Sequence, residues 1–236
     1  MAVYILIHGA WHGGWCWERV VPLLEAAGHS AIAPDLPGIH DGSYGKDPLR
    51  TWADFVAELV RAQSEPVILA GHSRGGIVIS EAAERAPEAI ARLVYVNAFL
   101  LRRGETLLGV SARDDANLSA REMIADEAAG TISVDPASGA PRIYSQMDPA
   151  DIPAAAARLL PEPIAALMKP LRITPERFGS VKRAYIETSE DRVLSIALQR
   201  AMHEALPCDP VMTLPSDHSP FYSMPDALAR ALLSLA

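Results

Sequence analysis

Short apolar runs that alternate with amphipathic segments are the feature that most restricts how this chain can fold. Most of these runs lack polar alternation, which is typical of strands that are covered on both faces. They are rich in Val, Ile, Leu and Tyr and lie at 3–8, 30–35, 66–71, 92–99, 182–188 and 209–214. Their alternation with helical segments predicts an α/β fold, in which helices flank a mostly parallel sheet of about six strands.

The helical segments carry recognisable ends. Residues 15–28 finish on Gly28, and residues 51–63 open with Thr51 as a candidate N-cap. A third segment, 75–86, stops before Pro87, and a fourth, 225–236, closes the chain.

The alternation breaks between residues 101 and 180, where eight of the 19 prolines fall. Segments 119–129, 149–160 and 161–168 have the pattern of short helices, and 131–146 is typical of a small hairpin around Asp135 to Gly139. A partly ordered linker is the alternative, but the segment carries many apolar residues for one. We therefore expect a core of residues 1–100 and 181–236, with residues 101–180 inserted as a cap over the carboxyl edge of the sheet.

Charge and composition exclude several classes of partner. The chain has 21 Lys and Arg against 29 Asp and Glu, a formal charge of -8, and no basic stripe, which argues against nucleic acid and anionic membranes. The apolar run at the N-terminus is too short for a signal peptide, and no run reaches the roughly 18 residues of a membrane span. Cys16 and Cys208 lack metal-like spacing. We expect reduced thiols, a cytoplasmic location, and a monomer or homodimer.

The stretch GHSRGG places Ser73 between glycines, where an apolar run turns into a helix. In an open parallel sheet, reactive groups gather at the carboxyl ends of strands. Glycines at 71 and 75 suit the strained turn that presents a nucleophilic serine, and the helix start adds free N–H groups. The alternative is an ordinary N-cap serine with glycines for the turn.

A serine nucleophile needs a base and a third group that orients the base. Of the seven histidines, only His218 lies just after the last predicted strand, although an exposed loop histidine is the alternative reading. The acid should follow an earlier strand. Segment 182–188 is followed by Glu190 and Asp191, and either could serve. The order serine, acid, histidine is that of the α/β-hydrolase triad.

Attack on a carbonyl also needs two donors for the oxyanion. The backbone N–H of Arg74, which follows the nucleophile, is one candidate. The other is the N–H of Ala10 in the loop HGAWHGG. For the Arg74 guanidinium we expect a surface or ion-pairing role, and for Trp15 and Trp17 core packing.

These motifs resemble the α/β-hydrolase superfamily, within it the branch of plant methylesterases, hydroxynitrile lyases and related bacterial esterases. The matching pieces run from the first strand to the last helix: ILIHGAWHGGWCW, VPLLEAAGH, GHSRGG, YVNAF, ERFGSVKRAYIETSED and LPSDHSPFYSMP. The resemblance implies that the acid is Asp191, and that the segment after residue 100 is a cap that shapes the pocket.

The branch contains two chemistries. In the branch that this chain resembles, the plant-type lyases carry a threonine after the first-loop histidine and a lysine directly after the catalytic histidine, where it helps to stabilise the departing cyanide. This chain has Gly9 and Ser219 there. The absence of that lysine favours ester hydrolysis, with carbon–carbon lyase or ligand receptor as alternatives.

We therefore expect a serine carboxylesterase for small to medium neutral esters, with the triad Ser73, Asp191 and His218 and an oxyanion hole of Ala10 and Arg74. Trp11 and Phe99 are candidate substrate contacts, with core packing as their alternative. No cofactor is expected, and the histidine motifs lack zinc-ligand spacing.

Overall fold

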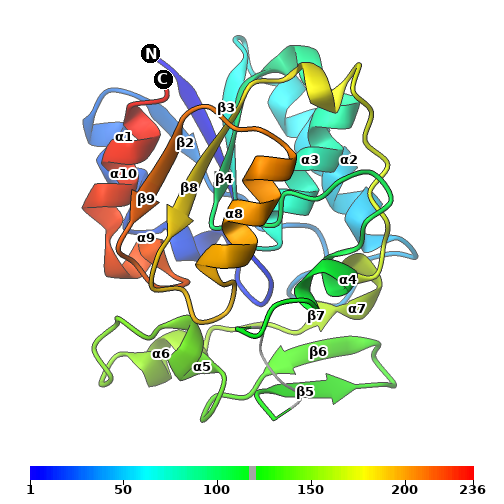
Figure 1. Ribbon diagram of the computed structural model, residues 1–236, viewed down its shortest axis with the longest axis vertical. Coiled ribbons are helices and arrows are strands. Elements are labelled where there is room, and N and C mark those ends of the chain that lie inside the picture. Colours follow the sequence, from blue (N-terminus) through cyan, green and yellow to red (C-terminus); the bar gives the residue numbers. More distant parts are fainter. Residues whose placement is uncertain (117–120) are drawn as a thin grey trace.

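A parallel six-stranded sheet forms the centre of the computed structural model, which describes residues 1–116 and 121–236 (Figure 1). Its strands run in the order β2-β1-β3-β4-β8-β9, and every neighbouring pair is parallel. They are β1 (Val3–Ile7), β2 (Ser30–Ile32), β3 (Val67–His72), β4 (Ile90–Val96), β8 (Arg183–Thr188) and β9 (Val211–Leu214). Each lies within one of the predicted runs or overlaps it, so the predicted sheet is confirmed.

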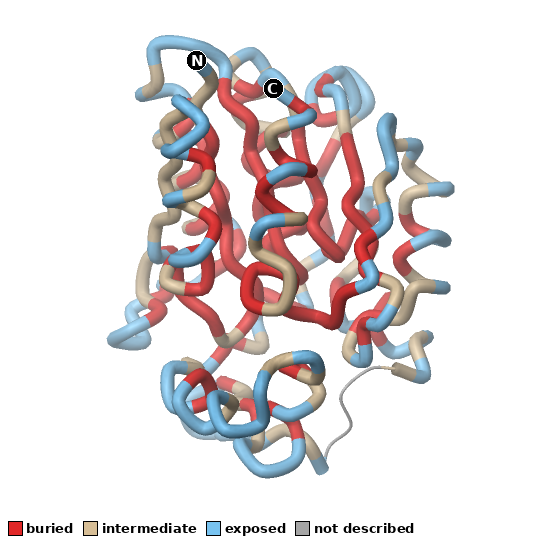
Figure 2. Tube along the Cα trace, turned by 90° about the vertical axis from the view of Figure 1, so that its left-hand side faces the viewer, coloured by how far each residue is buried: buried red, intermediate tan, exposed pale blue. Residues whose placement is uncertain are grey.

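Alternate side chains of these strands enter two separate apolar clusters. Ile5 and Ile7 pack on one face of the sheet, whereas Tyr4 and Leu6 pack on the other, and all four are fully buried. Figure 2 shows the strands as the buried centre of the core. Covering on both faces explains why the strand sequences lack polar alternation.

Helices cover each face. The cluster with Ile5 includes side chains from α2 (Pro48–Arg61), α3 (Gly75–Arg85) and α8 (Ile196–Ala205). The cluster with Tyr4 includes side chains from α1 (Val21–Ala26), α9 (Pro220–Ser223) and α10 (Pro225–Leu233). Three short 3-10 helices complete the core: η1 (Gly14–Trp17), η2 (Pro87–Ala89) and η3 (Phe178–Ser180).

The predicted N-cap of α2 is wrong. Asp47 caps the helix by accepting a hydrogen bond from the Arg50 N–H at 3.3 Å, and Pro48 occupies the first helical position. Proline suits that position because its missing N–H would have had no helical partner. Thr51 lies one turn further on, where its hydroxyl donates to the Asp47 carbonyl.

Residues 107–116 and 121–167 lie beneath the carboxyl ends of the strands in Figure 1. They hold an antiparallel sheet of β5 (Met123–Asp126), β6 (Thr131–Val134) and β7 (Glu162–Pro163). The described part of this segment also holds the short helices α4 (Leu107–Ser111), α5 (Ala140–Ile143), α6 (Ile152–Ala156) and α7 (Ile164–Leu167).

Two predictions in this segment are wrong. Residues 123–126 form a strand rather than part of a helix over 119–129, of which 119 and 120 lie outside the described residues. The hairpin joins β5 to β6 through residues 127–130, so it does not turn at 135–139, where the chain enters α5. Pairing of β6 with both neighbours overrides the local helical propensity of the Ala- and Glu-rich stretch. Within the predicted helical segment 149–160, residues 152–156 are helical as α6 and the rest are not, and 161–168 holds β7 before α7.

Two backbone hydrogen bonds join the chain just before this segment to the chain just after it. The Gly104 N–H donates to the Leu171 carbonyl at 2.9 Å, and the Leu171 N–H donates to the Glu105 carbonyl at 3.0 Å. The chain then follows α3, where Thr174 donates to the carboxylate of Glu84. Over the described ranges, no helix has the length and apolar character needed to cross a membrane.

Candidate active site

Ser73 occupies a strained turn between β3 and α3. Its φ of 50° lies in the left-handed region that non-glycine residues rarely adopt. The flanking glycines permit close packing: a Cβ at Gly71 would lie 2.7 Å from the Gly75 carbonyl oxygen, and a Cβ at Gly75 would lie 2.8 Å from the Ile7 carbonyl oxygen. The glycine pattern of GHSRGG is therefore required by the packing of this turn against β1 and its own helix.

Ser73, His218 and Asp191 form one hydrogen-bonded line. His218 Nε2 lies 3.1 Å from Ser73 Oγ, and His218 Nδ1 lies 2.8 Å from Asp191 Oδ2. The three side chains come from the loops after β3, β9 and β8, and all three residues are buried. This is the geometry in which a carboxylate orients an imidazole and the imidazole takes a hydroxyl proton.

Asp191, rather than Glu190, faces the histidine. Glu190 is exposed, whereas Asp191 Oδ1 accepts hydrogen bonds from the Val193 and Leu194 N–H groups at 2.8 and 2.9 Å. Burial alone raises the pKa of Asp191, but the charge of His218 and these hydrogen bonds outweigh it, so the pKa lies below its usual value. The carboxylate therefore stays ionised beside the imidazole.

Asn97 is a site residue that the sequence reasoning missed. Its Nδ2 donates to Asp191 Oδ2 at 2.9 Å and to the His218 carbonyl at 3.0 Å, and its φ is 32°. One sequence feature could have identified Asn97: it lies directly after β4, in YVNAF, at the same edge of the sheet as Ser73. A search for the acid alone does not find this position, because it holds an amide and not a carboxylate.

The loop after β1 lies against the serine. A Cβ at Gly9 would lie 3.0 Å from Ser73 Cβ and 2.7 Å from His72 Nδ1, so only glycine fits there. In the described chain, neither the Ala10 N–H nor the Arg74 N–H donates a hydrogen bond to another group. Both N–H groups therefore keep an unused donor within the described residues.

The Arg74 guanidinium is buried, not at the surface. Its residue is 1% exposed, and its Nε lies 2.9 Å from Glu162 Oε1 of β7. The predicted ion-pairing role of this guanidinium is therefore confirmed, and its predicted surface position is wrong.

The two candidate substrate contacts have different surroundings. Phe99 is buried in the cluster on the α3 face, and its N–H donates to the Ser73 carbonyl at 3.0 Å. Trp11 is partly buried, and its indole Nε1 donates to the Ile132 carbonyl of β6 at 2.9 Å. The Phe99 N–H therefore holds the backbone at Ser73, and the Trp11 indole ties the loop after β1 to β6.

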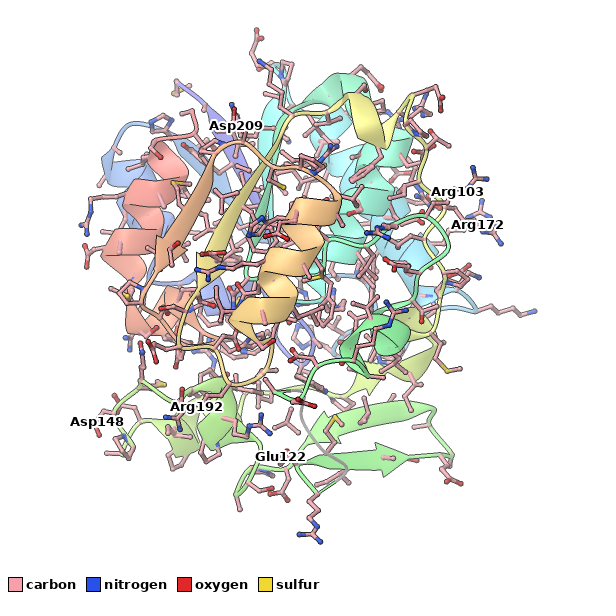
Figure 3. All side chains as sticks on the ribbon, in the orientation of Figure 1. Arg103, Glu122, Asp148, Arg172, Arg192 and Asp209 are labelled. Carbon is pink, nitrogen blue, oxygen red and sulfur yellow. The ribbon has the colours of Figure 1, made fainter. Side chains whose placement is uncertain are left out.

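Residues 107–167 also hold the loops of Asp191 and His218. Arg142 donates to Glu122 at 2.8 Å and to the carbonyl of Arg192, the residue after Asp191. Figure 3 labels Glu122 and Arg192 at this junction. The Ser219 hydroxyl donates to the Ile143 carbonyl at 3.0 Å, so α5 contacts the residue after His218.

Three buried imidazoles, those of His8, His12 and His72, surround the site and are neutral. Burial lowers the pKa of His12 to about 3. Burial also lowers the pKa values of His8 and His72 well below the usual value, with the charge of Arg74 adding to the effect on His8 and that of His218 adding to the effect on His72. No three His, Cys, Asp or Glu side chains of the described residues gather as metal ligands.

We expect acid to destabilise the protein below about pH 6.5, the usual pKa of an unfolded histidine. The lowered pKa values mean that each buried imidazole stabilises the fold fully above that pH and loses its contribution as the pH falls toward the folded-state pKa. Each imidazole gives a slope of about 1.4 kcal/mol per pH unit, and three give about 4 kcal/mol per pH unit. Urea unfolding at pH 7.5, 6.0 and 5.0 measures the slope. His12→Gln should reduce it by about a third, and an unchanged slope would contradict the assignment.

Comparison with known proteins places the whole chain in one family. The model of the alpha/beta hydrolase family matches residues 4–231. Methyl jasmonate esterase 1 of Vitis vinifera is 32% identical over 94% of this chain and 92% of its own length. Salicylic acid-binding protein 2 of Nicotiana tabacum is 30% identical over 99% of this chain and 95% of its own length.

A solved structure agrees in fold. The pyrethroid hydrolase from Sphingobium faniae JZ-2 superposes with a TM-score of 0.84 at 30% identity, over 99% of this chain and 96% of that one. The first curated relatives, from Arabidopsis thaliana, are longer: the chain spans 56%, 63% and 56% of the lengths of three of them. From the family match and these full-length likenesses, we conclude that the chain belongs to the alpha/beta hydrolase family, within the branch of the plant methylesterases.

Proposed function

We propose that this protein is a serine carboxylesterase that hydrolyses small to medium neutral carboxylic esters through an acyl-enzyme. The observation that carries the proposal is the buried line from Ser73 Oγ through the His218 imidazole to Asp191, at 3.1 and 2.8 Å. The names of the full-length relatives, methyl jasmonate esterase and pyrethroid hydrolase, support ester chemistry.

Acylation begins when Ser73 Oγ attacks the ester carbonyl carbon and His218 Nε2 takes the hydroxyl proton. Asp191 accepts from His218 Nδ1–H and stabilises the imidazolium that forms. The oxyanion receives hydrogen bonds from the Ala10 and Arg74 N–H groups. His218 then gives its proton to the departing alkoxide, and an alcohol leaves.

Deacylation repeats the sequence with water. His218 removes a proton from a water molecule, the hydroxide attacks the acyl carbon, and the second tetrahedral intermediate occupies the same oxyanion hole. Collapse expels Ser73 Oγ, which recovers its proton from His218, and the carboxylic acid is released. Each proton that His218 takes, first from Ser73 and then from water, it returns, first to the departing alkoxide and then to Ser73.

The surroundings of Ser73 favour an uncharged substrate. His12 and His72 are neutral there, and Arg74 is paired with Glu162. We propose that residues 1–100 and 181–236 form the catalytic core and that residues 101–180 form the cap that selects the ester. The contacts of Ile132 and Glu162 with the loop of Trp11 support a role of the cap in the site.

Two positions support hydrolysis over carbon–carbon lysis. Ser219 follows His218 and turns its hydroxyl to the Ile143 carbonyl, so no cation stands there to receive cyanide. The contact of Gly9 with Ser73 and His72 leaves no room for a hydroxyl-bearing side chain. A location in the cytoplasm, a small-molecule substrate, and the monomeric or homodimeric state stay predictions.

We expect the purified protein to hydrolyse para-nitrophenyl acetate, butyrate and octanoate and to release no cyanide from mandelonitrile. The dependence of kcat/KM on acyl length measures the size of the acyl pocket. Cyanide release without ester hydrolysis would indicate a carbon–carbon lyase and contradict the proposal. Neither activity, together with saturable binding of an ester, would indicate a receptor and contradict the proposal.

A further inference from the structure

The side chain of Arg74 lies on the carbonyl side of the peptide that joins Gly9 to Ala10. Its Nη2 donates to the Gly9 carbonyl at 2.9 Å, and its guanidinium carbon stands 4.4 Å from the centre of the Trp52 ring. His8 Nε2 accepts from the Leu36 N–H at 3.2 Å, so the His8 proton is on Nδ1, which donates to the same Gly9 carbonyl at 2.9 Å. One carbonyl thus receives a cationic and a neutral donor.

Those donors fix where the Ala10 N–H points. The Gly9–Ala10 peptide is trans, so its N–H and its carbonyl point in opposite directions. With the carbonyl held by Arg74 and His8, the N–H is directed away from the guanidinium. A cation on the carbonyl also draws electron density from the peptide, which makes the N–H of that peptide a stronger donor.

Glu162 completes the arrangement from β7. Its Oε1 lies 2.9 Å from Arg74 Nε, and its Oε2 accepts from the Trp11 N–H at 3.3 Å. The Trp11 carbonyl accepts from the Leu160 N–H at 2.7 Å, and Trp11 has a φ of 64°. A backbone in this region persists only where its surroundings hold it, and here the segment around β7 does so.

We propose that the buried pair of Arg74 and Glu162 positions the oxyanion hole, with Arg74 supplying one donor through its backbone and orienting the other through its side chain. The inference rests on the proposed esterase function. Arg74 and Glu162 are positioning residues, because their side chains act through the Gly9–Ala10 peptide and not on the substrate.

The first measurement is steady-state hydrolysis of para-nitrophenyl butyrate by Arg74→Met, Arg74→Lys and Glu162→Gln. Loss of a whole oxyanion donor costs about 10²- to 10³-fold in kcat, so misplacement of one donor should cost about 10- to 100-fold. We expect that loss in kcat for Arg74→Met, with KM changed less than about threefold, and smaller losses for Arg74→Lys and Glu162→Gln.

The second measurement isolates the oxyanion. 1,1,1-Trifluoro-2-octanone adds the serine oxygen to its carbonyl carbon and gives a hemiketal oxyanion, whereas 2-octanone stays a neutral ketone. For each variant, the inhibition constant of the trifluoromethyl ketone should rise by the same factor as kcat/KM falls, and that of 2-octanone should stay unchanged. Glu81→Gln is the matched control, because Glu81 is also a buried carboxylate and pairs with Arg85 at 2.7 Å. This substitution should alter stability without altering the ratio of the inhibition constants of the two ketones.

The outcomes separate the two proposals. If the wild type binds both ketones equally, the serine forms no hemiketal and the esterase function fails. If the wild type prefers the trifluoromethyl ketone and all folded variants keep that preference while urea unfolding shows lower stability, the pair only ties the cap to the core and this inference is overturned. Should Arg74→Met not fold, Arg74→Lys and Glu162→Gln carry the test alone.

Discussion

Ser73→Ala is expected to lower kcat for para-nitrophenyl butyrate by about 10⁴- to 10⁶-fold. The reason is chemical: the substitution deletes the hydroxyl that lies 3.1 Å from His218 Nε2, and with it the acyl-enzyme route. The residual rate over water should come from the oxyanion donors and substrate binding. Stopped-flow release of para-nitrophenol should show a burst for the wild type where deacylation is slower than acylation, and none for the variant.

Ser80→Ala is the matched control for this change. Ser80 is also buried, but it lies within α3, where it donates to the Gly76 carbonyl at 2.7 Å and contacts no member of the triad. Its loss should cost about 1 kcal/mol of stability and change kcat less than about threefold. Turnover by Ser73→Ala within tenfold of the wild type would remove Ser73 from the role of nucleophile.

Asp191→Asn is expected to lower kcat by about 10⁴-fold. An asparagine can donate to His218 Nδ1, which places the imidazole proton on Nε2 and leaves no acceptor for the Ser73 proton. The backbone donors of Val193 and Leu194 would still find an oxygen, so the loop should keep its conformation. Kinetics at pH 7.5 with urea unfolding of the same samples separates the catalytic loss from instability.

Glu190→Gln is the neighbouring control, because it removes a charge from the adjacent, exposed position. Its kcat should equal that of the wild type within about twofold. If Glu190→Gln lost the larger part of the activity, the acid would be Glu190 and the hydrogen bond of Asp191 to His218 would be structural.

The parts that sequence reasoning predicted correctly depend on local rules. Strands that are covered on both faces need no polar alternation, so the strands were visible as short runs rich in Val, Ile, Leu and Tyr. A serine turn before a helix needs small neighbours, so Gly71 and Gly75 marked Ser73. The positions after strands of a parallel sheet meet at one edge, which brought His218 and Asp191 into consideration.

The parts that failed depend on partners that are distant in the chain. The stretch 123–126 has helical composition but pairs with β6, and the surface role predicted for Arg74 ignored the carboxylate of Glu162, which β7 brings near. Thr51 was a valid N-cap type, but Asp47 with Pro48 started the helix one turn earlier. In each case, a contact formed in the folded chain overrode the structure that the local sequence favours.

The sequence by itself determined the α/β class, the order of the strands in the chain, and the serine and histidine that meet, since periodicity and turn chemistry are written in neighbouring residues. It narrowed the carboxylate to Glu190 or Asp191, and the family resemblance implied Asp191. Only the tertiary structure decided that Asn97 braces Asp191, 94 residues away, and that Arg74 meets Glu162, 88 residues away. Such pairs depend on which surfaces are buried against one another, and burial is a property of the folded chain that no local pattern encodes.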